Sequence, residues 1–274
     1  MPPKVGIIAG TGELPLRLAE SCRAQGREVF AITFEGENEN AAIAAAGIPS
    51  ARVGIGAVGK TLALLKANKC EELVLAGKFQ RPSLSSIKPD FRGARLLPKV
   101  ARATGDDSIL GVIMAEFEKE GFRVVGADTL MPKLRAEEGA VGTLTPSGLA
   151  AADIDMGRAV LDVLGPFDIG QAIIVERGRV IGIEGPEGTD NLVARCAPLL
   201  HEKGVGVLVK ARKRGQDERA DLPAIGPRTV KACAEAGLAG IAVEAGGAIV
   251  IDKTGTAAEA DARGLFVIGF AARA

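Results

Sequence analysis

Residues 4–15, KVGIIAGTGELP, decide the fold that we expect for this chain. The apolar run that ends at Ala9 is typical of a short buried strand, and a helix is predicted from Glu13 to Gln25, close behind two glycines. The chain then alternates short strands (28–34, 73–76 and 122–126) with helices (58–68, 91–103 and 107–120). Alternation of this kind indicates a parallel sheet with helices on its faces.

The second half of the chain predicts another α/β unit. Thr145 and Pro146 are typical of the N-cap and first position of a helix, which runs to about Leu164. Further elements are expected at 172–175 and 180–184 (a hairpin), 190–202, 205–209 and 228–236, and near Ile241 and Ile249.

The stretch between these halves is rich in turn residues and charges, and includes Pro132 and Gly139. We therefore expect two α/β domains joined by a linker at 131–145. The N-terminal domain, 1–130, is expected to have a Rossmann-like parallel sheet, and the C-terminal domain, 146–274, to be mixed α/β.

Composition narrows the class of protein. The 274 residues are 47% hydrophobic and 25% charged, as in globular α/β proteins, and 34 basic residues balance 34 acidic ones. This balance and the absence of Tyr and Trp argue against nucleic-acid binding. Four scattered cysteines and a single histidine, His201, argue against a zinc site or a disulfide framework.

No segment has the apolar length of a signal peptide or a membrane span, so a cytoplasmic location is expected. A peripheral membrane contact stays open, because it needs only an apolar surface patch.

The first candidate site is the turn after the first strand, where backbone N–H groups can approach a phosphate at the positive end of the following helix. Its candidate residues are Gly10, Gly12, Glu13 and Leu14. The turn resembles a dinucleotide-binding fingerprint, with Glu35 near the position of a ribose-binding acid, but Pro15 replaces the third glycine. Nucleotide contact and an ordinary tight turn are equal alternatives here.

Two shorter motifs in the first half carry candidate residues. AGKFQRP at 76–82 follows a predicted strand and should share a sheet edge with the first turn, so Gly77, Lys78 and Arg81 are candidates for phosphate or base contacts. GDD at 105–107 precedes a helix. Asp106 is either a Mg²⁺ ligand or a helix cap.

The most charged stretch is KARKRGQDERADLPAIGPRT at 210–229, between a predicted strand and a predicted helix. Mixed charges at such a position suit a polyanion held with a divalent metal, although a solvated charged turn is the alternative. EGPEGTD at 184–190 occupies a similar position. The two loops are expected to converge on one anion and metal site, built from Thr189, Asp190, Gln216, Asp217 and Asp221.

Six ordered motifs together resemble one family: GTGELP at 10–15, AGKFQRP at 76–82, GDD at 105–107, EGTD at 187–190, GQD at 215–217 and DLPAIG at 221–226. They are similar to the UDP-2,3-diacylglucosamine pyrophosphatases of the LpxI type, over essentially the whole chain. The resemblance implies a Mg²⁺-dependent hydrolase of lipid A biosynthesis that splits UDP-2,3-diacylglucosamine into UMP and 2,3-diacylglucosamine 1-phosphate (lipid X). It also implies that the N-terminal domain holds the UDP portion and the C-terminal domain the acylated sugar phosphate.

On this resemblance we expect Mg²⁺, or Mn²⁺ in its place, to be held by carboxylates, chiefly Asp221 with Asp217 and Asp106, while Lys210 or Arg228 neutralises charge. Substrate and lipid X are the expected small-molecule partners, with a peripheral contact to the inner membrane and a homodimer as further expectations. Two alternatives stay open: an oxidoreductase or transferase that uses NAD(P) or a nucleotide sugar, and a non-catalytic nucleotide-binding module.

Overall fold

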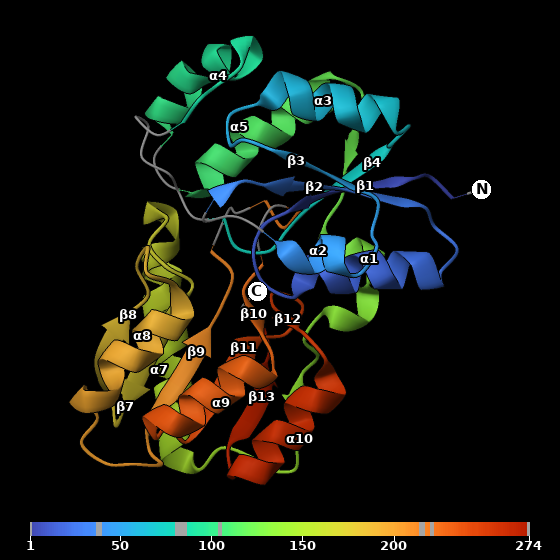
Figure 1. Ribbon diagram of the computed structural model, residues 1–274. Coiled ribbons are helices and arrows are strands. Elements are labelled where there is room, and N and C mark those ends of the chain that lie inside the picture. Colours follow the sequence, from blue (N-terminus) through green and yellow to red (C-terminus); the bar gives the residue numbers. More distant parts are fainter. Residues whose placement is uncertain are drawn as a thin grey trace. The chain divides into compact units, whose positions relative to one another are not determined.

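The computed structural model describes residues 2–36, 40–79, 87–103, 106–213, 217–219 and 222–272, with the side chains of 106 and 107 left out. The chain forms two compact units, drawn together in Figure 1. Unit 1 comprises Met1–Pro132 and Asp217–Asp221, and unit 2 comprises Lys133–Gln216 and Leu222–Ala274.

Unit 1 is built on a five-stranded parallel sheet of order β3-β2-β1-β4-β5. The strands are β1 (Val5–Ala9), β2 (Val29–Phe34), β3 (Ser50–Val53), β4 (Glu72–Ala76) and β5 (Arg123–Val124). Every residue of β1 and β4 is buried, as expected of central strands covered on both faces. This order matches the first five strands of Rossmann-type sheets.

Helices cover both faces of this sheet: α1 (Leu14–Ala24), α2 (Ala41–Ala45), α3 (Val58–Ala67), α4 (Phe91–Arg102), α5 (Asp106–Lys119) and α6 (Ala127–Leu130). In Figure 1, α1 and α2 lie on one face and α3 and α5 on the other. Leu62 and Leu65 of α3 and Phe117 of α5 pack with Ile8 and Ile32 of the strands in one buried cluster.

Unit 2 contains a six-stranded mixed sheet of order β6-β13-β11-β9-β7-β8. Its strands are β6 (Gly139–Ala140), β7 (Ala172–Glu176), β8 (Arg179–Ile183), β9 (Val207–Lys210), β11 (Gly240–Glu244) and β13 (Phe266–Phe270). β9, β11 and β13 are parallel, whereas β6 and β7 run antiparallel to their neighbours. A separate parallel pair joins β10 (Ala224–Ile225) to β12 (Ile249–Val250).

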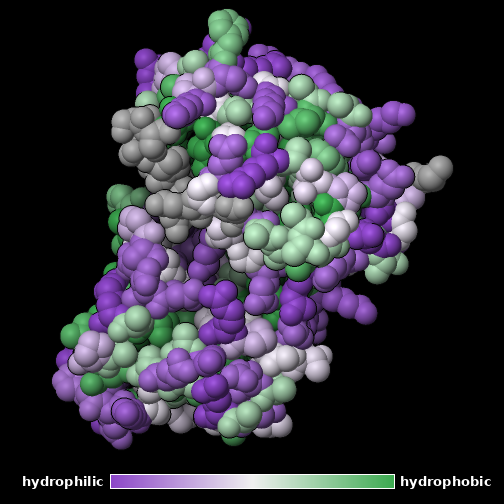
Figure 2. Space-filling view, viewed as in Figure 1, coloured by the Kyte–Doolittle hydropathy of each residue, from purple (hydrophilic) through white to green (hydrophobic). Residues whose placement is uncertain are grey.

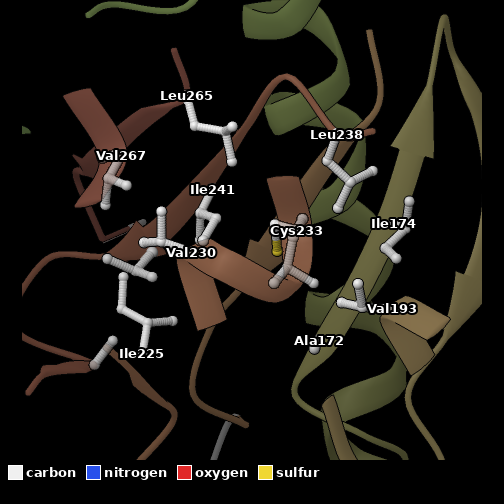
Figure 3. Packing of buried hydrophobic residues seen from close by; sticks show 14 of the residues in the cluster. Ala172, Ile174, Val193, Ile225, Val230, Cys233, Leu238, Ile241, Leu265 and Val267 are labelled. Carbon is white, nitrogen blue, oxygen red and sulfur yellow. The ribbon is translucent and has the colours of Figure 1, made fainter. Parts of the chain in front are cut away.

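The two faces of the mixed sheet bury separate clusters. The helices are α7 (Gly148–Leu164), α8 (Gly188–Cys196), α9 (Pro227–Ala236) and α10 (Lys253–Arg263), with short 3₁₀ turns η3 (Pro132–Leu134), η4 (Gly165–Phe167) and η5 (Ala197–Leu199). Ile173 and Val175 of β7 pack with α7, and the alternate residue Ile174 packs toward α8 and α9. Figure 3 shows the second cluster, with Val193 beside Ala172 and Ile174.

The predicted fold class, two α/β units with a parallel and a mixed sheet, is confirmed. Several boundaries differ. The range 131–145, expected as linker, contains η3 and β6, and Leu134 and Ala136 in it are buried. The prediction of Thr145 as N-cap of α7 was wrong: Ser147 is the cap, and its hydroxyl accepts from Ala150 N at 3.3 Å.

The helix predicted to reach residue 202 ends as α8 at Cys196. The helix does not continue because Pro198, in the first turn of η5, cannot donate the backbone hydrogen bond that the next helical turn would need. Among the described residues, no helix is both long enough and apolar enough to cross a bilayer.

Candidate functional site

The carboxyl ends of β1 and β4 carry two loops that are bonded to each other. Thr11 N donates to Lys78 O, and Lys78 N donates back to Thr11 O, both at 2.9 Å. The Thr11 hydroxyl also donates to Lys78 O at 3.1 Å. The expectation that the loops at 10–13 and 77–78 share one edge of the sheet is therefore confirmed, since Ala9 pairs with Ala76.

Gly10 and Gly77 allow this close approach. A Cβ at Gly10 would lie 2.5 Å from Lys78 O, and a Cβ at Gly77 would lie 2.5 Å from Thr11 O. The buried Asn40 fixes the same loop, because its side-chain amide donates to the carbonyls of Gly10 (2.7 Å) and Gly12 (3.1 Å). The loop conformation needs glycine at both positions, whatever ligand it meets.

Gly12 differs from these two glycines. It is exposed, its φ is +96°, and a Cβ there would meet no atom within 4 Å. The next residue, Glu13, lies 3.8 Å from Arg17 in an exposed ion pair and does not cap α1 with its side chain. Leu14 starts the helix. The edge thus presents main chain and open space at a helix N-terminus, which is an arrangement that can admit a phosphate.

Other predicted residues of unit 1 lie around this edge or outside the described part. Glu35 follows β2, whose carboxyl end is at the same edge as that of β1. Lys78 is exposed. Arg81 lies outside the described residues.

Unit 2 holds a buried polar network where β9 ends. Lys210 Nζ donates to the Thr189 hydroxyl at 2.9 Å and to Ala224 O at 3.1 Å. The Thr189 hydroxyl donates to Glu184 Oε1 at 2.6 Å, and Glu184 Oε2 accepts from Gln171 N at 3.0 Å. Lys210, Thr189 and Glu184 are 5%, 6% and 8% exposed, so each depends on its partners for hydrogen bonding.

A second pair of predicted residues lies at the surface on neighbouring helices. Arg228, in the first turn of α9, has Nη2 3.9 Å from Asp190 Oδ2 on α8. Thr189 and Asp190 are adjacent in sequence, so the buried network and this exposed pair are neighbours. The structure therefore brings Lys210, Thr189, Asp190 and Arg228 together.

Two acidic residues at this edge were not among the sequence candidates. Glu184 follows β8 and ties Thr189 to the start of β7. Glu244 ends β11, and its carboxylate accepts from Arg212 N at 3.0 Å and lies 3.4 Å from Arg212 Nε. Both occupy strand ends, which is the one sequence signal that could have marked them.

The predicted metal ligands do not form a site in the described residues. Asp217 belongs to unit 1 rather than to the C-terminal half, and Arg219 donates to both of its carboxylate oxygens, at 2.9 Å and 2.7 Å. This guanidinium holds the pKa of Asp217 below its usual range. Asp106 starts α5, but its side chain lies outside the described part, as do Asp221 and Gln216 entirely.

Across the described residues, no group of three or more His, Cys, Asp or Glu side chains could hold a metal ion. These residues therefore do not fit a Mg²⁺ site by themselves.

A pocket of about 450 Å³ lies at the opposite end of the unit 1 sheet, where β1, β4 and β5 begin. Most of its charged residues are paired: Glu72 with Arg27 and Arg123, and Glu120 with Lys66. This pairing makes the pocket a poorer candidate for an anionic ligand than the loop edge.

The cysteines and the single histidine are the remaining reactive side chains. All four cysteines are buried, and burial raises the pKa of Cys70 to about 11 and of Cys233 to about 12. His201 is exposed, and its backbone N–H donates to Glu176. Neither residue type belongs to the network at Lys210.

Comparisons with known proteins identify the family of this chain. Models of the LpxI N-terminal and C-terminal domains match residues 4–134 and 137–268. The chain belongs to the LpxI family. One relative in this family, from Caulobacter vibrioides, is named UDP-2,3-diacylglucosamine pyrophosphatase LpxI and is 41% identical, with 97% of each chain covered.

Solved structures similar to this member of the LpxI family are distant. N5-carboxyaminoimidazole synthetase from Staphylococcus aureus is 14% identical, with 67% of this chain and 42% of that chain covered and a TM-score of 0.25. The biotin carboxylase domain from Hydrogenobacter thermophilus is 12% identical, with 72% and 41% covered and a TM-score of 0.27. Likenesses this weak support no conclusion about either unit.

Proposed function

We propose that this chain hydrolyses the pyrophosphate bond of UDP-2,3-diacylglucosamine and releases UMP and 2,3-diacylglucosamine 1-phosphate (lipid X). The observation that carries the proposal is the likeness, over 97% of both chains, to a relative named for acting on this substrate. The two sheet edges described above supply complementary features for its two halves.

We assign the UDP portion to the loop edge of unit 1. Gly12 and the N-terminus of α1 face open space, and the Thr11 to Lys78 bridge fixes the loops before any ligand binds. A preformed edge of main-chain groups at a helix N-terminus suits phosphate oxygens. Glu13, Leu14, Lys78 and Arg81 complete the residues that we assign to this contact.

We assign the acylated sugar phosphate to the network of unit 2. Lys210 keeps its amine buried at a strand end, and Arg228 presents a guanidinium nearby that is 74% exposed. Thr189 and Ala224 hold the Lys210 amine in place. A positive charge that is already in position stabilises the negative charge that develops on phosphate oxygens, because the site does not have to reorganise during the reaction. Asp190 and Gln216 are the other residues that we assign here.

We further propose that activity requires Mg²⁺, with Mn²⁺ as a substitute, and that Asp221 is the chief ligand. This proposal rests on the sequence of the loop at 217–221, since oxygen ligands suit hard cations. Asp217 would have to exchange its two bonds from Arg219 for a metal, which makes it the weaker candidate.

The substrate carries acyl chains, and we therefore propose a cytoplasmic protein with peripheral contact to the inner membrane, acting alone or as a homodimer. The rivals are an oxidoreductase or transferase that uses NAD(P) or a nucleotide sugar, and a non-catalytic nucleotide-binding module. The strand order of unit 1 and Glu35 favour them.

The deciding experiment measures UMP release from the purified substrate with water as the only co-substrate. We expect turnover with Mg²⁺ and its loss in excess chelator. Asp221→Ala should reduce kcat by more than tenfold, which corresponds to about 1.4 kcal/mol of transition-state stabilisation. Asp155→Ala, on an exposed part of α7, is the matched control and should leave kcat unchanged.

Absence of UMP release under all conditions would contradict the proposal and favour the rivals. Full activity in chelator would contradict only the metal requirement.

A further inference from the structure

Helix α4 has two chemically different faces. Its inner face carries Gly93 and Leu96, both buried, and the helix packs on α3 and α5. A Cβ at Gly93 would lie 2.0 Å from Gly56 O, so the backbones are in close contact there. Arg92 also belongs to this side, because it pairs with Glu116 of α5 (3.2 Å) and with Glu120, which directly follows α5.

The outer face of α4 carries one aromatic residue and three cations. Phe91, Arg95, Lys99 and Arg102 follow one another at spacings of four, four and three residues, which places them along one side of a helix. Phe91 is 81% exposed, the most of any large apolar residue in the described part, and the three cations are exposed as well. Arg95 lies over the Phe91 ring, 6.0 Å from its centroid.

These cations are not neutralised locally. α4 contains no acidic residue, and Arg95, Lys99 and Arg102 form no ion pair with any residue that the structure describes. The nearest acid in sequence, Asp90, caps the helix by accepting from Gly93 N at 2.8 Å and Lys60 N at 3.0 Å. The outer face therefore keeps its positive charge although the whole chain is neutral.

We propose that the outer face of α4 docks on an anionic lipid bilayer. Exposed cations are attracted to anionic headgroups. An exposed aromatic ring beside them can enter the interfacial region of the bilayer, where burial of its apolar surface and its contact with a cation both stabilise the bound state. Figure 1 shows α4 at the border of unit 1, and the corresponding part of Figure 2 shows hydrophilic residues beside hydrophobic ones.

A bilayer suits this face better than a nucleic acid does. Three cations on one short helix fall below the number of phosphate contacts that give nucleic-acid complexes their affinity, and a single Phe offers one stacking platform. Docking on a bilayer would bring the protein to its proposed lipid substrate, and in that respect the inference rests on the proposed function. Binding to the bilayer itself needs no substrate.

The first test compares two charge variants of the full chain in sedimentation with vesicles. Arg95→Gln/Lys99→Gln/Arg102→Gln removes the outer cations, and Arg23→Gln/Lys69→Gln/Lys203→Gln removes three exposed cations elsewhere, with the same change in net charge. On vesicles that contain phosphatidylglycerol we expect the α4 variant to bind roughly 100-fold more weakly than the unaltered chain, from about 1 kcal/mol for each cation. The control variant should bind normally, and added salt should weaken binding of the unaltered chain.

The second test uses the absence of Trp from the chain. Phe91→Trp places a single indole on α4, and its emission should shift to the blue on phosphatidylglycerol vesicles and be quenched by lipids brominated near the headgroup. Vesicles of phosphatidylcholine alone should give a much smaller change. Neither test contains the UDP-lipid, so a negative result would leave the proposed hydrolase standing.

Equal loss of binding in the two charge variants would overturn the assignment to α4, and so would an indole that responds to RNA but not to anionic vesicles. The α4 charge variant should also keep full UMP release on substrate dispersed in neutral detergent, while losing it on anionic vesicles. Loss in both media would count against a docking role.

Discussion

The strand-end edges of the two units are built by different means. In unit 1 the edge is made of main chain: two glycine loops bonded to each other, with the carbonyls of Gly10 and Gly12 fixed by Asn40. In unit 2 it is made of buried side chains, Lys210, Thr189 and Glu184. The unit 1 edge should be sensitive to substitutions that change backbone conformation. The unit 2 edge should be sensitive to substitutions that change side-chain polarity and keep side-chain volume.

The largest effect should come from Lys210→Met. The change keeps the length of the side chain but removes the buried charge, and the Thr189 hydroxyl can still donate to Glu184. We expect kcat for UMP release to fall by roughly 10² to 10³, as for loss of one preorganised donor in other enzymes. Lys231→Met, at a position on α9 that is 58% exposed, is the control. An unchanged kcat would remove Lys210 from the proposed site.

Thr189→Val should have the next largest effect, because it keeps the shape of the side chain and removes the link between Lys210 and Glu184. We expect stability to fall by about 1–3 kcal/mol, since two buried groups lose a partner. Turnover should fall roughly tenfold. Thr256→Val removes another buried hydroxyl, which donates to Ile251 O at 2.9 Å, and should cost similar stability with normal turnover. Equal turnover in both variants, measured with urea midpoints, would argue against a positioning role.

Gly12→Val tests the main-chain edge. A branched side chain would occupy the open space beside α1 and strain a residue with φ of +96°, so KM for the UDP-lipid should rise roughly threefold to tenfold. Gly178→Val, in the turn between β7 and β8, has φ of +73° and equally open surroundings. The control should show the backbone strain without the change in KM. Equal KM values would indicate that UDP binds elsewhere.

The smallest effect concerns charge at the other end of the unit 1 sheet. Hydrogen bonds from Lys66, and then Arg92, lower the pKa of Glu120 from 4.5 to about 2. A lowered pKa means that the ionised pair stabilises the fold above pH 4.5, and that this stability is lost as pH falls through about 2. The difference in urea midpoint between the unaltered chain and Glu120→Gln should therefore be small at pH 7 and shrink further below pH 4.5. A difference that grows with acidity would contradict the assignment.

The fold was predictable where burial is uniform. β1 is apolar throughout and β4 is apolar after Glu72, because both faces of these strands are covered, and such runs stand out in a sequence. α10 gave no such signal, since it buries only Thr256 and Ala260, and β6 and β10 have two residues each. Their existence depends on tertiary pairing, which no local pattern records.

The sequence was sufficient to predict which loops form the candidate site, but not which hydrogen bonds their side chains make. Lys210 and Thr189 were chosen for their positions at strand and helix ends, and the structure joins them. Asp217 shows why the rest could not be predicted: a carboxylate in a charged loop suits a metal or a guanidinium equally well. Only the arrangement in space shows that Arg219, two residues away, takes both oxygens.

That same arginine has a consequence for anyone who wishes to study the halves separately. Arg219 also donates to Glu118 Oε1 at 2.5 Å and to Val124 O at 3.5 Å, so unit 1 is completed by a segment that comes from beyond residue 216. A fragment that ends at Pro132 would match the N-terminal family domain almost residue for residue and still lack this piece. Expression of the N-terminal half alone would therefore not reproduce the complete unit 1.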